Sequence, residues 1–279
     1  MKKIITLTTI LIQVLILNAC SLLYYDYNFE IPEFDTYKIE TLTFEDYVPS
    51  NVNDITDIEI FLNEQAVLAN IKLITTSYDT EVIFSRKDVY TGSGVIFYEN
   101  EDYYYALSNY HVVDKVDGYI NRHIEVRDYY NNSYHAFIYP DSLDYNLDLV
   151  VIVFEKTDTQ LQVLELVDGQ IEVGRDVIVI SNPLSSVNVI TYGTVKMYSL
   201  VKVTNRDGEE KSNLFMSIGH DALINNGSSG SMLINYDFKI VGINYAGQDD
   251  DEADSLSFAV PSILVVDYLN NLIRNQQPS

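Results

Sequence analysis

Short apolar runs separated by turn-forming residues dominate the chain between residues 71 and 244. The runs are rich in β-branched and aromatic residues, which favour strands, whereas acidic residues, asparagine and glycine fill the segments between them. Because helical patterns are not interleaved with the runs, the spacing predicts an antiparallel barrel or sandwich instead of a parallel sheet covered by helices. The predicted strands include Ile71–Thr75, Gly94–Phe97, Tyr104–Leu107, Leu149–Phe154, Val177–Ile180, Asn188–Thr191, Leu214–Ile218 and Ile240–Asn244.

Two segments that border this region have helical spacing. Between Asp57 and Asn70 the apolar residues indicate a short helix. Near the C-terminus, Pro261-Ser262 precedes apolar residues that fit one face of a helix over residues 262–274. The sequence contains no internal repeat and no low-complexity segment.

The N-terminus has the pattern of an export signal. Lys2-Lys3 precedes an almost entirely apolar run, Ile4–Leu17, which is short for a bilayer span. The run ends at Leu17-Asn18-Ala19-Cys20, which resembles the lipobox of bacterial lipoproteins. The resemblance implies that residues 1–19 are removed and that Cys20 is acylated, which would anchor the protein on the outer face of the cell membrane. The alternative is an ordinary cleavage site followed by an unmodified cysteine.

Residues 20–56 mix acidic residues with tyrosine and phenylalanine and show no clear period. We interpret them as a tether between the lipid and the folded domain, and the alternative is that their aromatic side chains pack onto that domain. The whole chain carries a formal net charge of −24, and loss of the two lysines before Cys20 makes the mature charge −26. Such a surface repels phosphate backbones and anionic head groups, so a nucleic-acid partner is not expected. Cys20 is the only cysteine, which excludes an internal disulfide.

Three polar residues in distinctive contexts suggest nucleophilic catalysis. His111 follows an apolar strand, Asp148 opens the run Leu149–Phe154, and Ser229 lies in the small-residue segment Gly227–Gly230. A serine hydroxyl needs an imidazole to accept its proton, and the imidazole needs a carboxylate to fix its tautomer. Small neighbours let backbone N–H groups converge on the developing oxyanion, and the expected donors are the N–H groups of Gly227 and Ser229.

The chain order of these residues discriminates between hydrolase classes. No histidine follows residue 220, so the Ser-Asp-His order of α/β-hydrolases is excluded. A subtilisin-like order would need alternating helices, which the pattern lacks. His111, Asp148 and Ser229 are in the order of chymotrypsin-like barrels, which places histidine and aspartate in a first barrel and serine in a second. Ser228 is a rival nucleophile with the glycines at the wrong offsets, and Asp144 and Asp141 are rivals of Asp148.

Several motifs resemble those of HtrA (Deg) proteases and related bacterial trypsin-like enzymes, in the order of that family and over residues 65–270. The resemblance implies an all-β double barrel over residues 57–279, with a first barrel at about 70–160, a second at about 170–260 and the C-terminal helix. It implies a serine endopeptidase that needs no cofactor and acts on proteins or peptides through His111, Asp148 and Ser229. The motifs are Thr91-Gly92-Ser93-Gly94, Ser108-Asn109-Tyr110-His111-Val112-Val113, Asp148-Leu149-Val150-Val151-Ile152, Ser181-Asn182-Pro183, Gly193-Thr194-Val195, Asp221-Ala222-Leu223-Ile224-Asn225, Gly227-Ser228-Ser229-Gly230, Val241-Gly242-Ile243-Asn244 and Phe258-Ala259-Val260-Pro261.

The sequence also departs from the family pattern. The family's Gly-Pro after the serine motif is replaced by Ser231-Met232, and Ser231 is closer to the pattern of glutamyl endopeptidases. The chain ends at Ser279, so we expect no PDZ domain. These departures motivate an alternative function, a protease-fold surface protein that binds other proteins with weak or no turnover.

Similarity to trypsin-like enzymes also indicates the substrate-binding residues. Tyr245, Ala246 and Gly247 follow a strand that lines the specificity pocket in those enzymes, and Leu223 takes the position of its buried floor. An apolar floor predicts cleavage after aliphatic residues. The acidic run at 249–254 is expected to be a solvated loop, with a calcium site or a selector of basic peptides as alternatives. No HExxH motif and no cluster of cysteine and histidine is present, so a catalytic metal is not indicated.

Overall fold

The computed structural model describes residues 55–79, 86–183, 186–204, 210–247 and 256–276. The predicted signal segment, Cys20, all but the last two residues of the tether, and the acidic run at 249–254 lie outside the described residues. None of the helices in the described ranges combines the length and the apolar character that a membrane-spanning helix needs.

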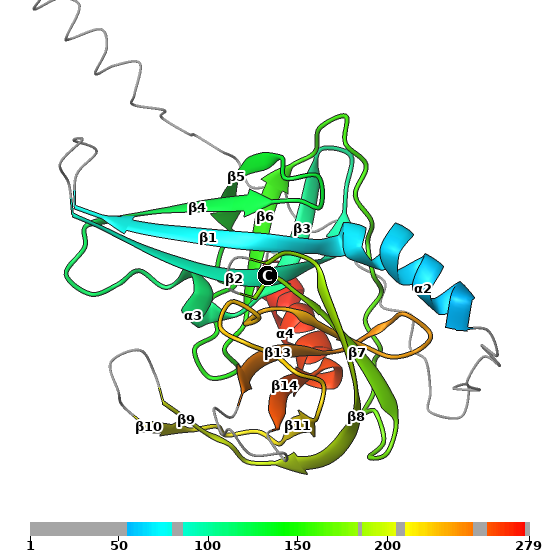
Figure 1. Ribbon diagram of the computed structural model, residues 1–279. Coiled ribbons are helices and arrows are strands. Elements are labelled where there is room, and N and C mark those ends of the chain that lie inside the picture. Colours follow the sequence, from blue (N-terminus) through cyan, green and yellow to red (C-terminus); the bar gives the residue numbers. More distant parts are fainter. Residues whose placement is uncertain (1–54, 80–85, 184–185, 205–209, 248–255, 277–279) are drawn as a thin grey trace, which may run out of the picture. The chain divides into compact units, whose positions relative to one another are not determined.

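The first half of the described chain forms a closed antiparallel barrel (Figure 1). Its strands are joined in the order β1-β2-β3-β6-β5-β4, and the β1–β4 pairing closes the ring. Its core is mostly aliphatic and includes an aromatic group in which Tyr104 and Tyr134 both lie against Phe154. The strands are β1 (Asn70–Tyr78), β2 (Lys87–Glu99), β3 (Tyr103–Ser108), β4 (Asn121–Arg127), β5 (Ser133–Ile138) and β6 (Val150–Glu155).

The second half forms another closed antiparallel barrel, in the order β11-β14-β13-β12-β7-β8. Its buried core consists of aliphatic residues such as Val177, Ile218 and Leu233. A separate two-stranded hairpin, β9 (Lys202–Thr204) with β10 (Glu210–Ser212), branches off between β8 and β11. The barrel strands are β7 (Asp176–Ser181), β8 (Val189–Ser199), β11 (Ser217–His220), β12 (Met232–Ile234), β13 (Ile240–Gly247) and β14 (Ser257–Pro261). The predicted double barrel is therefore confirmed.

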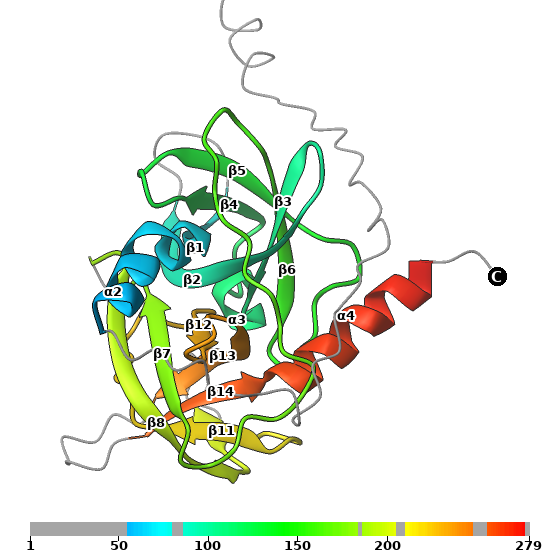
Figure 2. The same cartoon turned by 90° about the vertical axis from the view of Figure 1, so that its right-hand side faces the viewer.

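Helices occur before, within and after the barrels. The segment predicted as one helix over 57–70 is instead α2 (Ile55–Glu64) followed by a 3₁₀ turn, η2 (Ala66–Ala69), because Asn70 already pairs with Val95 in the β1–β2 ladder. A single turn, α3 (Tyr110–Val113), follows β3. The predicted C-terminal helix is present as α4 (Ser262–Gln276), which continues directly from β14 (Figure 2). Its buried residues include Val265, Val266, Leu269 and Leu272.

One predicted strand is displaced. The apolar run Leu214–Ile218 suggested a strand, but β11 begins only at Ser217 and continues to His220. Leu214 is 80% exposed, since the strand ladder with β8 and β14 starts after it. The apolar run therefore indicates roughly where the strand lies but not the residues at which it begins and ends.

Candidate active site

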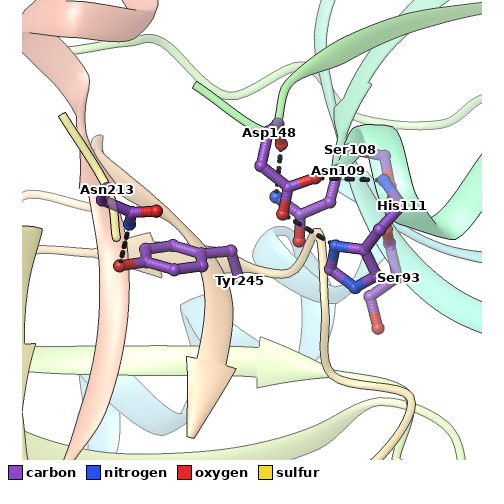
Figure 3. A network of polar contacts seen from close by, with 7 residues as sticks. All are labelled: Ser93, Ser108, Asn109, His111, Asp148, Asn213 and Tyr245. Atoms are coloured by element: carbon purple, nitrogen blue, oxygen red, sulfur yellow. Dashed lines mark hydrogen bonds and ion pairs between the residues drawn. The ribbon is translucent and has the colours of Figure 1, made fainter. Parts of the chain in front are cut away.

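His111 and Asp148 come together because the strands that precede and follow them are paired. His111 lies in α3 just after β3, and Asp148 lies just before β6. The two strands are antiparallel neighbours with Ser108 opposite Val150, so the residues beyond these ends converge. The Nδ1 atom of His111 lies 2.7 Å from Oδ2 of Asp148 (Figure 3). The backbone N–H of His111 donates to the other carboxylate oxygen over 3.0 Å.

The backbone of Asp148 is fixed as firmly as its carboxylate. Its carbonyl oxygen accepts from the side-chain amide of Asn109 at 2.9 Å and from the N–H of Tyr110 at 3.2 Å. Its φ of 55° lies in the left-handed region, which a non-glycine residue adopts at a cost of order 1 kcal/mol. An ionised carboxylate can only accept, so the proton of the imidazole resides on Nδ1 and the lone pair on Nε2. His111 is thus held in the tautomer that a general base requires.

Asp144, one of the rival carboxylates, has another role. Oδ1 of Asp144 accepts the N–H groups of Asn146 at 2.8 Å and of Leu147 at 2.9 Å, which closes a tight turn. The backbone of Asp144 also pairs with Leu149. Among the described carboxylates of this segment, Asp148 is the one that contacts His111.

Ser229 lies in the loop at residues 225–231, here called the nucleophile loop, which leads into β12. Its carbonyl oxygen accepts the N–H of Ser93 at 2.7 Å. A Cβ added at Gly92 would stand 2.5 Å from Cγ1 of Val112 and 3.1 Å from the carbonyl oxygen of Ser229. The backbone at Gly92 therefore lies between the residue next to His111 and the backbone of Ser229. The fold brings the predicted base and the predicted nucleophile to the same place.

The nucleophile loop leaves three N–H groups uncommitted in the part of the chain that the structure describes. The N–H groups of Ser228, Gly230 and Ser231 donate to backbone carbonyls at 2.8, 2.8 and 2.9 Å, and that of Asn225 donates to Oγ of Ser228, but those of Asn226, Gly227 and Ser229 donate to none. Gly227 has a φ of 96°, a conformation that glycine adopts without strain. Gly227 and Ser229 are the two predicted oxyanion donors, and their N–H groups have the freedom that this role requires.

Ser228, the rival nucleophile, is engaged within the protein. Its side chain is fully buried, and its Oγ lies 3.1 Å from Oγ of Ser181. The same Oγ accepts the N–H of Asn225 at 3.2 Å. Ser229 is partly exposed, so a substrate can reach it.

The predicted substrate-binding residues differ in location and in burial. Tyr245, Ala246 and Gly247 form the end of β13. Tyr245 is buried, its hydroxyl lies 2.6 Å from Nδ2 of Asn213 and 2.7 Å from Oγ of Ser217, and burial raises its pKa to about 12 (Figure 3). The two contacts of its hydroxyl therefore fix the Tyr245 ring near the C-terminal end of β13.

The expectation of a buried floor at Leu223 is wrong. Leu223 is 64% exposed, because Ala222 before it is fully buried and Thr191 holds the Leu223 carbonyl at 2.9 Å, which turns the side chain outward. Ile224 is the apolar residue that faces β13. Its Cγ1 would lie 3.2 Å from a Cβ added at Gly247. The sequence analysis did not identify Ile224 as a substrate-binding residue. The only indication in the sequence was its position next to Leu223, the expected floor of the specificity pocket.

The remaining histidines lie away from the His111–Asp148 pair. His220 is fully buried, and its Nε2 lies 2.8 Å from Oδ1 of Asn244. Burial lowers the pKa of His220 to about 4. His123 and His135 stack on neighbouring strands with ring centroids 4.8 Å apart, and burial lowers the pKa of His135. Among the described residues, no three histidine, cysteine or acidic side chains are arranged to hold a metal ion.

Residues 92–243 match the family described as "Trypsin-like peptidase domain". The chain is similar to serine protease Do-like HtrA of Bacillus subtilis (strain 168), with 32% identity over 181 residues that cover 62% of this chain and 37% of the relative. It is similar to serine protease Do-like HtrB of the same organism, with 29% identity over 198 residues, 66% of this chain and 38% of the relative. It is also similar to serine protease HTRA4 of Mus musculus, with 33% identity over 138 residues, 48% of this chain and 26% of the relative.

The chain spans between about a quarter and two fifths of the length of these relatives. The family match covers more than half of the chain. It begins within β2, ends within β13 and contains all three candidate catalytic residues. This chain belongs to the family of trypsin-like peptidases and is similar to its HtrA-type members.

Proposed function

We propose that this protein is a serine endopeptidase that hydrolyses protein or peptide substrates through an acyl-enzyme on Ser229. The observation that carries the proposal is the His111–Asp148 pair, with Nδ1 and Oδ2 2.7 Å apart. Gly92 of β2 lies between Val112, the neighbour of His111, and the backbone of Ser229. The uncommitted N–H groups of Gly227 and Ser229 add the electrostatic part of the site.

In the proposed reaction, the Ser229 hydroxyl attacks the carbonyl carbon of the scissile bond and its proton passes to Nε2 of His111. Asp148 stabilises the imidazolium that forms. The N–H groups of Gly227 and Ser229 donate to the oxyanion of the tetrahedral intermediate. His111 then gives the proton to the leaving amine, and a water molecule repeats the sequence to release the acyl group. No cofactor takes part.

Replacement of the nucleophile tests this function. Ser229→Ala is expected to lower kcat for a protein or peptide substrate by on the order of a million-fold. Ser228→Ala is the matched control, and it should keep measurable turnover, because its hydroxyl is held by Ser181 and Asn225 and takes no part in the reaction. Chelators should leave the rate unchanged. Near-normal activity of purified Ser229→Ala would overturn the proposal.

The alternative function is a protease-fold surface protein that binds other proteins with little turnover. Its motivation is the replacement of the family's Gly-Pro by Ser231-Met232. Ser231 is fully buried and its Oγ accepts the side-chain amide of Asn244 at 3.0 Å. Met232 is fully buried at the start of β12, paired with Ile180 and Ile243. Ser231 and Met232 are therefore both buried and bound within the barrel, so their departure from the family pattern does not favour the binding-protein alternative.

We also propose that the protein is a lipoprotein anchored through Cys20 on the outer face of the cell membrane. The support is Leu17-Asn18-Ala19-Cys20 after a charged, apolar leader. Since the chain has a net charge of −24, anionic head groups do not attract it, and acyl chains must supply the attachment. Cys20→Ser should leave the protein unprocessed or shed. Mass spectrometry of the mature wild-type protein should find acylated Cys20, and an unmodified Cys20 would contradict the anchor.

A third proposal concerns specificity. Ile224, apolar and partly buried beside Gly247, supports cleavage after small or medium aliphatic residues. The acidic run at 249–254 follows β13 in the sequence and favours Lys or Arg at flanking substrate positions. An ion pair between solvated charges contributes about 0–1 kcal/mol and is screened by salt, so the flanking preference should fade at high salt. A peptide-library profile tests both features. Strict cleavage after Glu would contradict the proposal and favour similarity to glutamyl endopeptidases.

A further inference from the structure

Ser93 is a buried residue of β2 to which the proposed mechanism gives no role. Its side chain is fully buried, although it stands in the first barrel next to the nucleophile loop of the second. The carbonyl oxygen of Ser93 accepts the hydroxyl of Ser108 at 2.7 Å (Figure 3). Its N–H and its hydroxyl both reach across to the second barrel.

Two carbonyl groups of the nucleophile loop bind to Ser93. The N–H of Ser93 donates to the carbonyl oxygen of Ser229 at 2.7 Å. The Oγ of Ser93 donates to the carbonyl oxygen of Gly227 at 2.8 Å. The carbonyls that Ser93 holds therefore belong to the same two residues whose N–H groups are the proposed oxyanion donors.

A third contact sets the direction of the hydroxyl. The backbone N–H of Asn182, in the turn between β7 and β8, donates to Oγ of Ser93 at 2.9 Å. Since this contact uses Oγ as an acceptor, the hydroxyl proton is directed to the Gly227 carbonyl. The side chain of Asn182 is tied in turn to the first barrel, because its Nδ2 donates to the carbonyl of Ile71 at 2.8 Å and its Oδ1 accepts from Asn70 at 3.1 Å.

The contact with Gly227 acts at the most adaptable point of the loop. Gly227 lacks a Cβ and adopts a φ of 96°, so its own sterics do not fix the peptide plane between Gly227 and Ser228. That plane is held at both ends, by the Ser93 hydroxyl on the carbonyl and by the 2.8 Å bond from the N–H of Ser228 to Asn225. The Gly227 N–H lies in the preceding peptide plane, which is joined to this one at the Cα of Gly227, so a fixed carbonyl limits the torsions through which the N–H can turn. Without the hydroxyl, the plane keeps one of these two bonds and a buried carbonyl loses its partner, which costs free energy.

We propose that Ser93 is a positioning residue for the oxyanion hole: its hydroxyl couples the contact between the two barrels, through Asn182, to the backbone torsions of Gly227, which set the direction of the Gly227 N–H. This inference rests on the proposed peptidase function. It assigns a role to the Thr91–Gly94 and Ser181–Pro183 motifs, which meet at this hydroxyl. The hydroxyl of Ser93 is buried away from the substrate and acts through Gly227.

Ser93→Ala tests the inference, because it removes the hydroxyl and leaves the backbone N–H that binds Ser229. Removal of one oxyanion donor lowers kcat by about 10²–10³-fold, so loosening a donor should lower kcat by about 10- to 100-fold. KM should change by less than about threefold, because the group acts in the transition state and not in substrate binding. A peptide aldehyde, which forms a tetrahedral adduct, should lose affinity in parallel with kcat.

Ser142→Ala is the matched control. The hydroxyl of Ser142 is also fully buried and also joins one N–H and one carbonyl, both of Val151 at 3.3 Å, but within the first barrel. It should lower the free energy of unfolding without a change in kcat. A kcat for Ser93→Ala that equals the wild-type value, or an equal drop in Ser142→Ala, would overturn the inference.

Asn182→Ala keeps the test decisive if Ser93→Ala does not fold. This variant retains both the Ser93 hydroxyl and the N–H that binds it, but loses the amide contacts with Ile71 and Asn70. A smaller drop in kcat at unchanged KM supports the inference, and an unchanged kcat contradicts it. The turnover of the wild-type protein and its loss in Ser229→Ala are measured first. A failure of the proposed function is then distinguishable from a failure of the Ser93 assignment.

Discussion

The base half of the proposed active site is built within the first barrel, whereas the nucleophile half depends on both barrels. His111, Asp148 and Asn109 hold one another through bonds between the ends of two paired strands. The nucleophile loop belongs to the second barrel, but Ser93 of the first barrel binds two of its carbonyls. Asn244 of β13 completes its support, as its backbone carbonyl accepts the N–H of Gly230 at 2.8 Å.

This difference predicts two classes of defect. A change in the base half alters the chemistry of one side chain and leaves the barrels as they are. A change near the nucleophile loop alters the association of the barrels, so stability and catalysis change together.

Among the variants that compare the two halves, Asp148→Asn is expected to lower kcat the most. In Asp148→Asn the amide can donate to the imidazole and stabilise the wrong tautomer, so kcat should fall by on the order of ten-thousand-fold. The free energy of unfolding should change far less than the activation barrier, as denaturant titration can check. Asp144→Asn is the matched control from the same segment, because its carboxylate closes a turn. A comparable loss of activity in both variants would contradict the assignment of Asp148 as the carboxylate that orients His111.

The association of the barrels is tested at Gly230. A Cβ added there would stand 2.2 Å from the carbonyl oxygen of Ser93 and 2.3 Å from Oγ of Ser108, and the φ is 84°. Gly174 is the matched control, with a φ of 92° and nothing within 4 Å of the added Cβ. Gly174→Ala should cost only the backbone strain, about 1–2 kcal/mol. Gly230→Ala should cost several kcal/mol more or prevent folding, and equal costs in urea titrations would show that the barrels are not in close contact there.

His220 gives the second barrel a pH-dependent stability. Burial lowers its pKa from 6.5 to about 4, so the unfolded chain binds a proton in this range that the folded protein does not. Stability from this group is therefore complete above pH 6.5 and declines as the pH falls to about 4, by about 3 kcal/mol. In His220→Gln this component should be absent, so the urea stability of the wild type should fall more steeply over that range. Parallel pH curves for the two proteins would contradict the effect.

The smallest effect is expected at Leu223. Its side chain is 64% exposed, so Leu223→Ala should change kcat/KM by less than about threefold for any substrate. Ile224→Ala removes apolar volume beside Gly247 and should shift the preference towards larger residues before the cleaved bond. Cleavage profiles of the two variants separate these positions, and a larger shift for Leu223→Ala would restore the original assignment.

The sequence predicted the fold class because most barrel strands are short apolar runs. It did not single out β4 and β5. In β4 the buried residues Ile124 and Val126 alternate with the polar residues His123, Glu125 and Arg127, so no apolar run forms. Conversely, Leu214 belongs to an apolar run but lies outside β11. In β4 and β5, where buried and partly exposed residues alternate, local hydrophobicity gives no signal of a strand.

The candidate catalytic residues could be proposed from motifs, whereas their supports could not. His111, Asp148 and Ser229 stand in contexts that identify their chemistry. The roles of Ser93 and Asn182 depend on contacts between residues 89 positions apart, and no local pattern reports such contacts. The outward turn of Leu223 likewise depends on the hydrogen bond from Thr191, which comes from another strand.

The most direct test of the central claim is the site of covalent labelling by a fluorophosphonate probe, determined by intact mass and peptide mapping. Such a probe reacts with a serine only if a base activates it and an oxyanion hole stabilises the adduct. We predict a single adduct on Ser229 of the folded wild-type protein, a much slower reaction in His111→Ala, and none in Ser229→Ala. A folded wild-type protein that takes up no probe, or an adduct on Ser228, would contradict the account.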